Sequence, residues 1–244
     1  MMYQVSVDST IFTVWPEAAL GLVYATNINN RADTSAFATE ARGIEVAVRE
    51  RFPTAEAVGQ HPNIQAWRKA YRAFGCDPHK YRCSSEAIVR QVLKGNTVWG
   101  INPLVDCYNY ISLKYTVPVG GEDCAKIVGN VVLKRASGTE PFVRLGGSEN
   151  EPPEVGEVIY ADDAGVLCRR WNWREADRTK LTTDTTIAIL VIEAIPPMTI
   201  DALQQATTEL AELVQRWTGA TVQSRIITMA GEPVATFDSG SVKS

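Results

Sequence analysis

The chain has 244 residues and lacks the features that mark membrane and secreted proteins. Its best apolar run, from Ile187 to Ile195, is about half as long as the ~18 apolar residues that a transmembrane helix needs. The N-terminal segment MMYQVSVDST has neither the basic nor the apolar region of a secretory signal peptide. The apolar run therefore predicts a buried strand, and neither a membrane partner nor secretion is expected.

The cysteines do not form the pattern of a disulfide framework. Their number is odd, and they are scattered through a long chain. Such thiols are typical of a reducing compartment, so the sequence predicts a cytoplasmic protein with free cysteines. The five positions are Cys76, Cys83, Cys107, Cys124 and Cys168.

Standard catalytic and cofactor-binding signatures are also missing. The chain contains no phosphate-binding glycine-rich loop and no nucleophile elbow, and it has only two histidines, His61 and His79. His61 precedes Pro62 at a predicted helix start, where a capping or surface role is expected. Cys76, His79 and Cys83 have a spacing that zinc could use, but no fourth ligand lies nearby in the sequence. We therefore predict no metal and no cofactor.

What is present is an ordinary globular composition with segregated charge. Hydrophobic residues make up 45% of the chain and charged residues 21%, which suits one large domain or two small ones. The net charge of -4 argues against a general polyanion binder. However, residues 67–94 carry seven basic against two acidic side chains, and residues 169–180 carry five against two. A local basic surface for one nucleic-acid segment is therefore compatible with the acidic total.

The order of the predicted elements indicates an α+β fold. Apolar residues at helical spacing come first, and short β-like runs separated by Gly, Pro and Asp dominate later. A last helix is expected after Pro196-Pro197, followed by a strand. Strands are expected in the first 30 residues (including Ile11, Phe12 and Val14) and at 131–133, 142–145, 158–161, 166–168, 187–192 and 222–229, with helices at 34–51, 63–74, 84–94, 102–115 and 199–217.

The segment from Asn102 to Asp123 carries polar residues that suit a binding site. On the helix that Asn102 caps, Asp106 and Asn109 are three residues apart and share a face. They could orient an ammonium or hydroxyl group, or they could hold a neighbouring loop. Gly120-Gly121 could expose backbone N–H groups to a ligand, although a simple turn is the default interpretation.

The second dense cluster is CRRWNWREADRTK, residues 168–180. Trp171 and Trp173 flank Asn172 among several basic residues. Tryptophan and arginine together offer stacking surfaces and phosphate-binding forks, which are typical of single-stranded RNA recognition. The alternative is that a tryptophan lies in the core and the arginines form a solvated face.

These motifs resemble a known family. The order Asn102-Pro103-Leu104-Val105-Asp106, Asn109-Tyr110, Val117-Pro118 and Asp123 is similar to the B3/B4 editing domain of the bacterial phenylalanyl-tRNA synthetase β subunit. The segment WRKAYRAFGCDPHKYRCSSEAIVRQVLKG and the WNWR box resemble the stand-alone B3/4 proteins. The resemblance implies a single domain over residues 1–244 with a mixed sheet or sandwich core: an extension at 1–60, the core at 61–195 and a helix with strands at 196–244.

The resemblance also implies an activity, namely hydrolysis of the ester that joins a wrong amino acid to the 3′ end of a tRNA. Some stand-alone members are associated with clearing canavanine from arginine tRNA. Two departures from the synthetase motif stand out. Gly120 replaces a histidine, and the WNWR box replaces a glycine-rich stretch of the pocket. Glu193 aligns with the glutamate that reads the amino-acid side chain in the synthetase.

Roles follow from this resemblance together with the chemistry of ester hydrolysis, which needs positioning, a water and oxyanion donors. The expected partner is an aminoacylated tRNA. The alternatives are a non-catalytic RNA-binding module and a hydrolase of free small esters or amides. The expected catalytic residues are Asn172, Gly120 and Gly121; the substrate-binding residues are Asp106, Asn109, Asp123, Trp171, Trp173 and Glu193; and the tRNA-binding residues are Lys80, Arg82, Arg90, Arg170, Arg174, Arg178 and Lys180.

Overall fold

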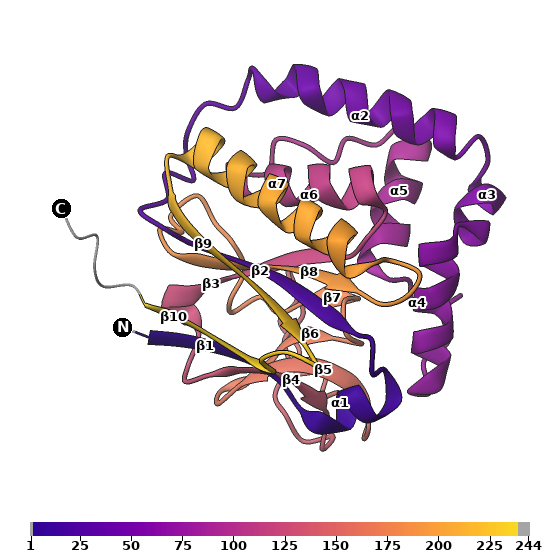
Figure 1. Ribbon diagram of the computed structural model, residues 1–244, viewed down its shortest axis with the longest axis vertical. Coiled ribbons are helices and arrows are strands. Elements are labelled where there is room, and N and C mark those ends of the chain that lie inside the picture. Colours follow the sequence, from indigo (N-terminus) through magenta and orange to yellow (C-terminus); the bar gives the residue numbers. More distant parts are fainter. Residues whose placement is uncertain (1, 239–244) are drawn as a thin grey trace.

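Two β-sheets pack face to face, and a layer of helices covers one of them (Figure 1). The computed structural model describes residues 2–238, so the last six residues of the expected domain lie outside the described residues. One sheet has the order β3-β8-β2-β9, with strands Val119–Asp123, Ala188–Ala194, Ala19–Thr26 and Thr221–Thr228. The other has the order β10-β1-β4-β5-β6-β7, with strands Val234–Asp238, Met2–Val7, Val131–Arg135, Val158–Asp162, Gly165–Arg169 and Arg174–Glu175. This arrangement confirms the α+β prediction.

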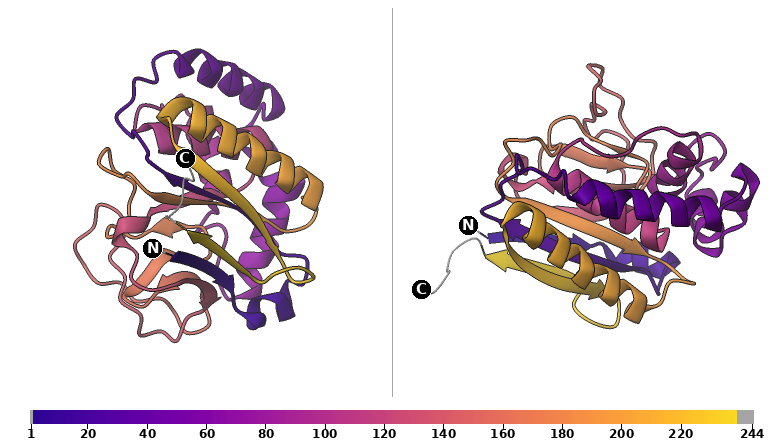
Figure 2. Two further views of the ribbon diagram at one scale, coloured as in Figure 1. Left: turned by 60° about the vertical axis from the view of Figure 1, so that its left-hand side comes forward. Right: turned by 90° about the horizontal axis from the view of Figure 1, so that it is seen from above.

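The helices lie on the outer face of the four-stranded sheet and along one end of the sandwich (Figure 2). Helix α7 packs on β2, α6 packs on α7, and α2 packs on α6. The helices are α1 (Ser9–Val14), α2 (Phe37–Arg51), α3 (Ala55–Gln60), α4 (Pro62–Ala73), α5 (Ser84–Leu93), α6 (Pro103–Tyr115) and α7 (Ile200–Thr218), and a short 3-10 helix spans Cys124–Lys126.

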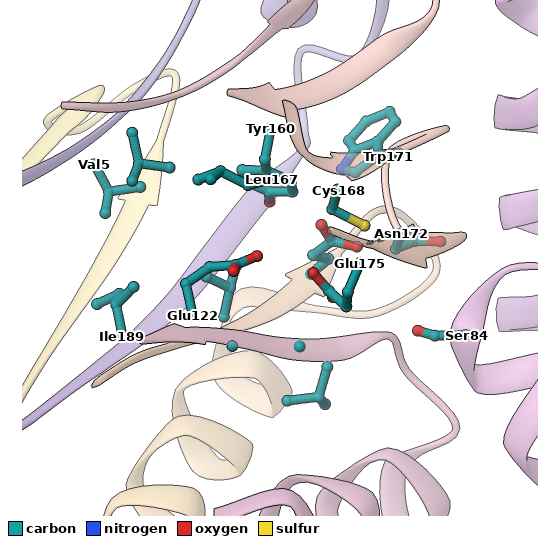
Figure 3. A pocket seen from close by; sticks show the side chains of 16 residues that line it. Val5, Ser84, Glu122, Tyr160, Leu167, Cys168, Trp171, Asn172, Glu175 and Ile189 are labelled. Atoms are coloured by element: carbon teal, nitrogen blue, oxygen red, sulfur yellow. Dashed lines mark hydrogen bonds between the residues drawn. The ribbon is translucent and has the colours of Figure 1, made fainter. Parts of the chain in front are cut away.

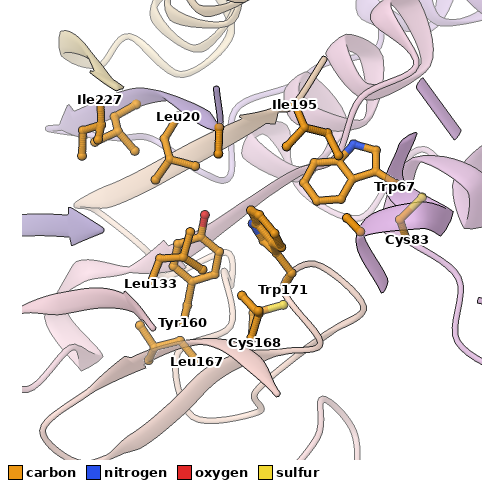
Figure 4. Close-up of a cluster of buried hydrophobic side chains, with 14 of the residues drawn as sticks. Leu20, Trp67, Cys83, Leu133, Tyr160, Leu167, Cys168, Trp171, Ile195 and Ile227 are labelled. Atoms are coloured by element: carbon orange, nitrogen blue, oxygen red, sulfur yellow. The ribbon is translucent and has the colours of Figure 1, made fainter. Parts of the chain in front are cut away.

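Side-chain alternation on β2 divides the core into two parts. Leu20 and Leu22 point between the two sheets, whereas Ala19 and Val23 face the helices. Because both faces of β2 are buried, the strand reads as a continuous apolar run. The part of the core between the sheets also receives Trp67 from α4 and Trp171 from the loop after β6 (Figure 4).

The strongest predicted helix start is confirmed. Asn102 caps α6 by accepting a hydrogen bond from the Val105 N–H at 3.1 Å, and Pro103 occupies the first turn. The cap is held further because Asn30 donates to the Asn102 side chain at 3.0 Å. This anchoring matters for the site because α6 leads directly into β3.

Three local predictions are wrong. Residues 11–14, expected in a strand, form α1, because Asp8 caps the turn by accepting from the Thr10 N–H at 2.9 Å. Residues 142–145 make only isolated bridges, since the Phe142 N–H bonds to the Asn150 side chain at 2.9 Å and Gly146 turns the chain with a φ of +71°. Gly120-Gly121 form no turn but lie inside β3, paired with β8.

Candidate functional site

A cavity lies between the two sheets, close to the loop that follows β6 (Figure 3). Its volume is about 40 Å³, which is room for a few water molecules. Figure 3 shows Val5 and Ser84 at opposite ends, with the Glu122 and Glu175 carboxyl groups turned into the space between them. We call it the carboxyl cavity; its lining residues are Val5, Ser84, Val119, Gly120, Gly121, Glu122, Val131, Tyr160, Leu167, Cys168, Trp171, Asn172, Glu175, Ile189, Val191 and Glu193.

Strand register places two of the carboxyl groups on the inner face of the four-stranded sheet. Glu122 lies opposite Ile189, which belongs to the core between the sheets. Glu193 lies four residue pairs further along, where its N–H bonds to the Pro118 carbonyl at 3.1 Å. Since side chains of directly opposed residues share a face, Glu122 and Glu193 both point between the sheets. Both side chains are buried.

The third carboxyl group, Glu175, comes from β7 of the opposite sheet and depends on a glycine. A Cβ atom at Gly120 would lie 2.7 Å from Glu175 Oε1. The absence of a side chain at Gly120 therefore leaves the space that the Glu175 carboxyl group occupies.

Glu122 and Glu175 form a hydrogen-bonded carboxyl pair. Burial, followed by the neighbouring Glu175 charge, raises the pKa of Glu122 well above its usual range. Burial also raises the pKa of Glu175, but hydrogen bonds from Glu122 and Cys168 act in the opposite direction. Glu122 is therefore the more readily protonated of the two and donates a hydrogen bond to the Glu175 carboxyl group.

Glu193 belongs to a separate chain of hydrogen bonds. The Tyr71 hydroxyl donates to Asn172 Oδ1 at 2.8 Å, and the Asn172 amide donates in turn to Glu193. Burial raises the pKa of Glu193 to about 8, although Tyr160 and Asn172 act against this shift. Asn172 thus connects α4 to β8 and fixes the Glu193 carboxyl group at the cavity wall.

The loop that delivers Trp171 and Asn172 has an unusual backbone. Arg170 and Trp171 have φ values of +49° and +66°, which are costly for residues other than glycine. Two contacts hold this turn. The Glu157 carboxylate accepts from the Arg170 N–H at 3.0 Å, and the Trp171 N–H bonds to the Val158 carbonyl at 2.6 Å. Trp171 then packs edge-on against Trp67 at a centroid distance of 5.0 Å.

A basic groove lies outside the cavity, on the surface of α5. It has a volume of about 260 Å³ and combines several cations with one tryptophan side chain. Trp173 is held by an edge-to-face contact with Tyr81 at 4.9 Å. The groove is lined by Lys80, Arg82, Ala87, Arg90, Gln91, Lys94, Trp173 and Arg174.

A third hollow of about 160 Å³, here called the passage, is lined in part by residues of both features. It shares Trp173 and Arg174 with the basic groove, and Ser84, Val119, Asn172 and Glu175 with the carboxyl cavity. The remaining lining residues come from α5 and α6: Ile88, Tyr108, Asn109 and Ser112. The basic groove, the passage and the cavity with its three carboxyl groups are therefore neighbours, with Trp173 on the wall between the groove and the passage.

The structure brings many of the expected site residues together. Gly120, Gly121, Trp171, Asn172 and Glu193 line the carboxyl cavity. Lys80, Arg82, Arg90, Trp173 and Arg174 line the basic groove, and Asn109 lines the passage. The Pro118–Glu193 hydrogen bond sets the alternation along β3, so the Gly120 N–H bonds within the sheet and the Gly121 N–H points away from β8.

Other expected residues have structural contacts away from these hollows. Asp106 accepts from the Gly100 N–H at 3.0 Å, and Asp123 accepts from the Thr185 hydroxyl at 2.9 Å. Arg170 is buried and lies over the Tyr81 ring at 3.8 Å. Arg178 pairs with Asp162 at 2.7 Å and Lys180 with Asp177 at 2.8 Å.

Sequence reasoning missed Glu122, Glu175, Tyr160 and Ser84, all of which line the cavity. A signal existed for Glu122, because a strand assignment for residues 119–123 would have placed it on the same face as Gly120. Glu175 had no comparable signal, since its role depends on the approach of the opposite sheet.

Residues 2–238 show neither a metal centre nor a membrane-spanning helix. In that part of the chain, no group of three or more His, Cys, Asp or Glu side chains has an arrangement that suits a metal ion. Cys76 and Cys83 are buried, and His79 is exposed. None of the helices in the same range is both long enough and apolar enough to span a lipid bilayer.

Comparison with known proteins agrees with the predicted resemblance. The model of the B3/4 domain family matches residues 66–235. The chain belongs to the B3/4 domain family. This match includes the groove, the passage and nearly all of the cavity wall.

Among curated B3/4-containing relatives is the phenylalanine–tRNA ligase β subunit of Nocardia farcinica, which is 28% identical over 198 residues, covering 68% of this chain and 22% of that protein. The Mycoplasma genitalium subunit is 31% identical over 84 residues, or 34% of this chain and 10% of that protein. The chain thus spans no more than 22% of the length of these relatives. An N-terminal fragment of the Pyrococcus horikoshii phenylalanyl-tRNA synthetase β subunit matches with a TM-score of 0.45 and 15% identity, covering 89% of this chain and 49% of that one.

The buried carboxyl groups predict that stability falls as the pH rises. Between pH 4.5 and about 8, Glu193 keeps its proton in the folded protein but loses it in the unfolded chain. As the pH rises through this range, the free energy of unfolding falls by up to ~1.4 kcal/mol per pH unit because of this group. The contribution of Glu193 to stability is therefore fully present only below pH 4.5. Urea unfolding across this range should show the decline, and Glu193→Gln should make it less steep. Glu149 is exposed, so Glu149→Gln serves as the control. If the free energy of unfolding declined with pH equally steeply in Glu193→Gln and Glu149→Gln, the assignment to Glu193 would be contradicted.

Proposed function

We propose that the protein binds the 3′ end of an aminoacylated tRNA and hydrolyses the ester that carries a wrongly attached amino acid. The observation that carries this proposal is that the passage shares lining residues with the basic groove on one side and with the carboxyl cavity on the other. A nucleic-acid backbone is complementary to the groove, and a covalently attached amino acid would extend from it toward the carboxyl groups. The phenylalanine–tRNA ligase β subunits among the relatives support tRNA as the nucleic acid.

The groove suits the terminal nucleotides of a tRNA. Lys80, Arg82 and Arg174 offer cations for phosphates. A base would stack on the Arg174 guanidinium group, which lies over the partly exposed Trp173 ring at 5.4 Å. A free small ester would need neither feature. The groove therefore favours a nucleic-acid substrate over a free metabolite.

The cavity favours a cationic amino acid. Three carboxyl groups surround a small space, while Val5, Leu167 and Ile189 line its apolar side. An aliphatic stem would pack on that apolar side, and an ammonium or guanidinium-like head would lie among the three carboxyl groups, where its positive charge favours their ionised form. Because the cavity alone is small, the aminoacyl group would span both cavity and passage. Canavanine, with its arginine-like side chain, is the substrate we propose to test first.

The test is a deacylation assay with a panel of mischarged tRNAs. The purified protein is incubated with canavanyl-tRNA(Arg), arginyl-tRNA(Arg) and tyrosyl-tRNA(Phe), and loss of the ester is followed against spontaneous hydrolysis. We expect acceleration with the canavanyl ester and little with the tyrosyl ester. Binding of tRNA without acceleration for any member would support the alternative, a non-catalytic RNA-binding module.

A double variant in the groove is expected to weaken tRNA binding. Lys80→Ala with Arg174→Ala removes two cations, which should raise KM for the tRNA by about 10- to 100-fold, with a smaller effect on kcat. The salt dependence of binding should also become shallower, by roughly 0.7 in the log–log slope for each phosphate that is no longer neutralised. The measurement is binding and deacylation across a salt series.

The matched comparison removes the same charge elsewhere. Arg178→Ala with Lys180→Ala takes away two cations that pair with Asp162 and Asp177 outside the groove. Its effect on KM should be much smaller. Equal effects of the two double variants would mean that total charge, rather than the groove, determines binding.

A further inference from the structure

Glu175 differs from the other two carboxyl groups in its position. Glu122 and Glu193 line only the carboxyl cavity, whereas Glu175 lines both the cavity and the passage. Glu175 as a residue is partly exposed although its Oε2 atom is buried, whereas Glu122 and Glu193 are buried residues. An ester bond between a tRNA in the groove and an amino acid in the cavity would pass through the passage. Glu175 is therefore the carboxyl group that lies where the reacting atoms would be.

We propose that Glu175 is the general base of this site and activates the water that hydrolyses the ester. This inference rests on the proposed function, since it assigns a step of that reaction to a residue. It also explains why a glycine at position 120 matters for the reaction, because the Glu175 carboxylate lies where a side chain on residue 120 would begin.

The step balances without any further reactant. The Glu175 carboxylate takes a proton from a water molecule as the water oxygen bonds to the ester carbonyl carbon. The resulting tetrahedral intermediate then breaks its bond to the ribose oxygen, and the proton held by Glu175 passes to that oxygen. The products are a free amino acid and a tRNA with its terminal hydroxyl restored, and Glu175 is again a carboxylate.

Glu122 holds Glu175 in the state that this step requires. Its carboxyl group donates a hydrogen bond to Glu175, which lowers the pKa of Glu175 against the effect of burial and favours the ionised form that a base needs. A base whose pKa is raised toward neutrality accepts a proton from water more readily than an ordinary carboxylate does. The titratable groups that face Glu175 from the surrounding elements are Glu122, Glu193, Cys168, Tyr108 and Tyr160.

The test compares two isosteric variants in one cavity. Glu175→Gln removes the base and should lower kcat by about 10²- to 10⁴-fold with a small change in KM. Glu122→Gln keeps a hydrogen-bond donor toward Glu175 and should lower kcat far less. If both carboxyl groups only bind a cation, the two variants should instead raise KM to a similar extent and leave kcat alike, which would overturn the proposal.

The pH profile supplies a second readout. In the wild type, kcat/KM should fall on the acid side as Glu175 becomes protonated. Glu122→Ala removes the hydrogen bond that lowers the pKa of Glu175, so this acid limb should move to higher pH, while in Glu122→Gln it should stay near its wild-type position. An acid limb that does not move in Glu122→Ala would contradict the assignment.

Gly120→Ala provides an independent variant that retains every carboxyl group. The added Cβ atom would lie 2.7 Å from Glu175 Oε1, so the carboxylate must shift and kcat should fall. Circular dichroism and urea unfolding establish that each variant is folded before its kinetics are compared. A wild type that deacylates no member of the tRNA panel would overturn the proposed function and this role with it. An active wild type with Glu175→Gln within about threefold of it would overturn the role of Glu175 alone.

Discussion

Alanine in place of Glu157 is expected to lower the free energy of unfolding by about 3–5 kcal/mol. Glu157 is buried and makes a two-fold contact with Arg169, with Nε–Oε1 and Nη2–Oε2 distances of 2.9 and 2.8 Å. Without the carboxylate, the Arg169 guanidinium would remain buried without its counter-charge. The Arg170 N–H would also be left without its acceptor. Chemical denaturation of the variant provides the measurement.

Two comparisons separate this mechanism from general disturbance of the loop. Glu154→Ala removes an exposed carboxylate from the same segment and should change stability by no more than about 0.5 kcal/mol. A double variant, Glu157→Met with Arg169→Met, removes both charges and should be more stable than Glu157→Ala alone. If the double variant were the less stable of the two, the uncompensated charge would not be the cause.

The second large effect is expected at Trp171. Trp171→Ala should cost about 3–5 kcal/mol, because the indole ring is buried and packs edge-on against Trp15 and Trp67 at 4.9 and 5.0 Å. Trp171→Phe keeps an aromatic ring in the cluster and should be less destabilised. Urea unfolding of the three proteins gives the order.

Glycine at this position tests the backbone separately from the packing. Trp171→Gly removes the same indole ring as Trp171→Ala, but it relieves the left-handed conformation, with a φ of +66°. In most buried positions glycine is the more harmful replacement. Here Trp171→Gly should be at least as stable as Trp171→Ala, and a clearly less stable glycine variant would show that the turn carries no strain.

Sequence patterns predicted the helices better than the short strands, for identifiable reasons. The start of α6 follows from Asn102 and Pro103, whose effects on a helix terminus are local. β3 was missed because its glycines favour a turn in isolation, and only pairing with β8 makes them extended. Helix α1 was missed because its apolar residues fit either period over so few positions, while the Asp8 cap decides the outcome.

The site was predictable to the extent that its residues are neighbours in sequence. The WNWR box and the basic residues before α5 stand out in the sequence, and the structure joins Trp173 and Arg174 with Lys80 and Arg82 in one groove. The sequence could not show which arginines line the groove and which are held in structural contacts. Arg170 is buried against Tyr81, and Arg178 is paired with Asp162, because contacts from distant segments decide which cations remain available. Glu175 required knowledge of both sheets at once.

The contact between Gly120 and Glu175 limits how these two positions can change in related chains. A Cβ atom on residue 120 would lie 2.7 Å from Oε1 of Glu175, so the two side chains compete for the space beside β3. A single replacement at residue 120 would therefore be harmful by itself and tolerated together with a smaller residue at 175, so substitution effects at the two positions would not add. Members of the B3/4 family with a bulky residue at position 120 should carry a short one at position 175. The two positions would then divide the family into two groups with different chemistry at one wall of the cavity.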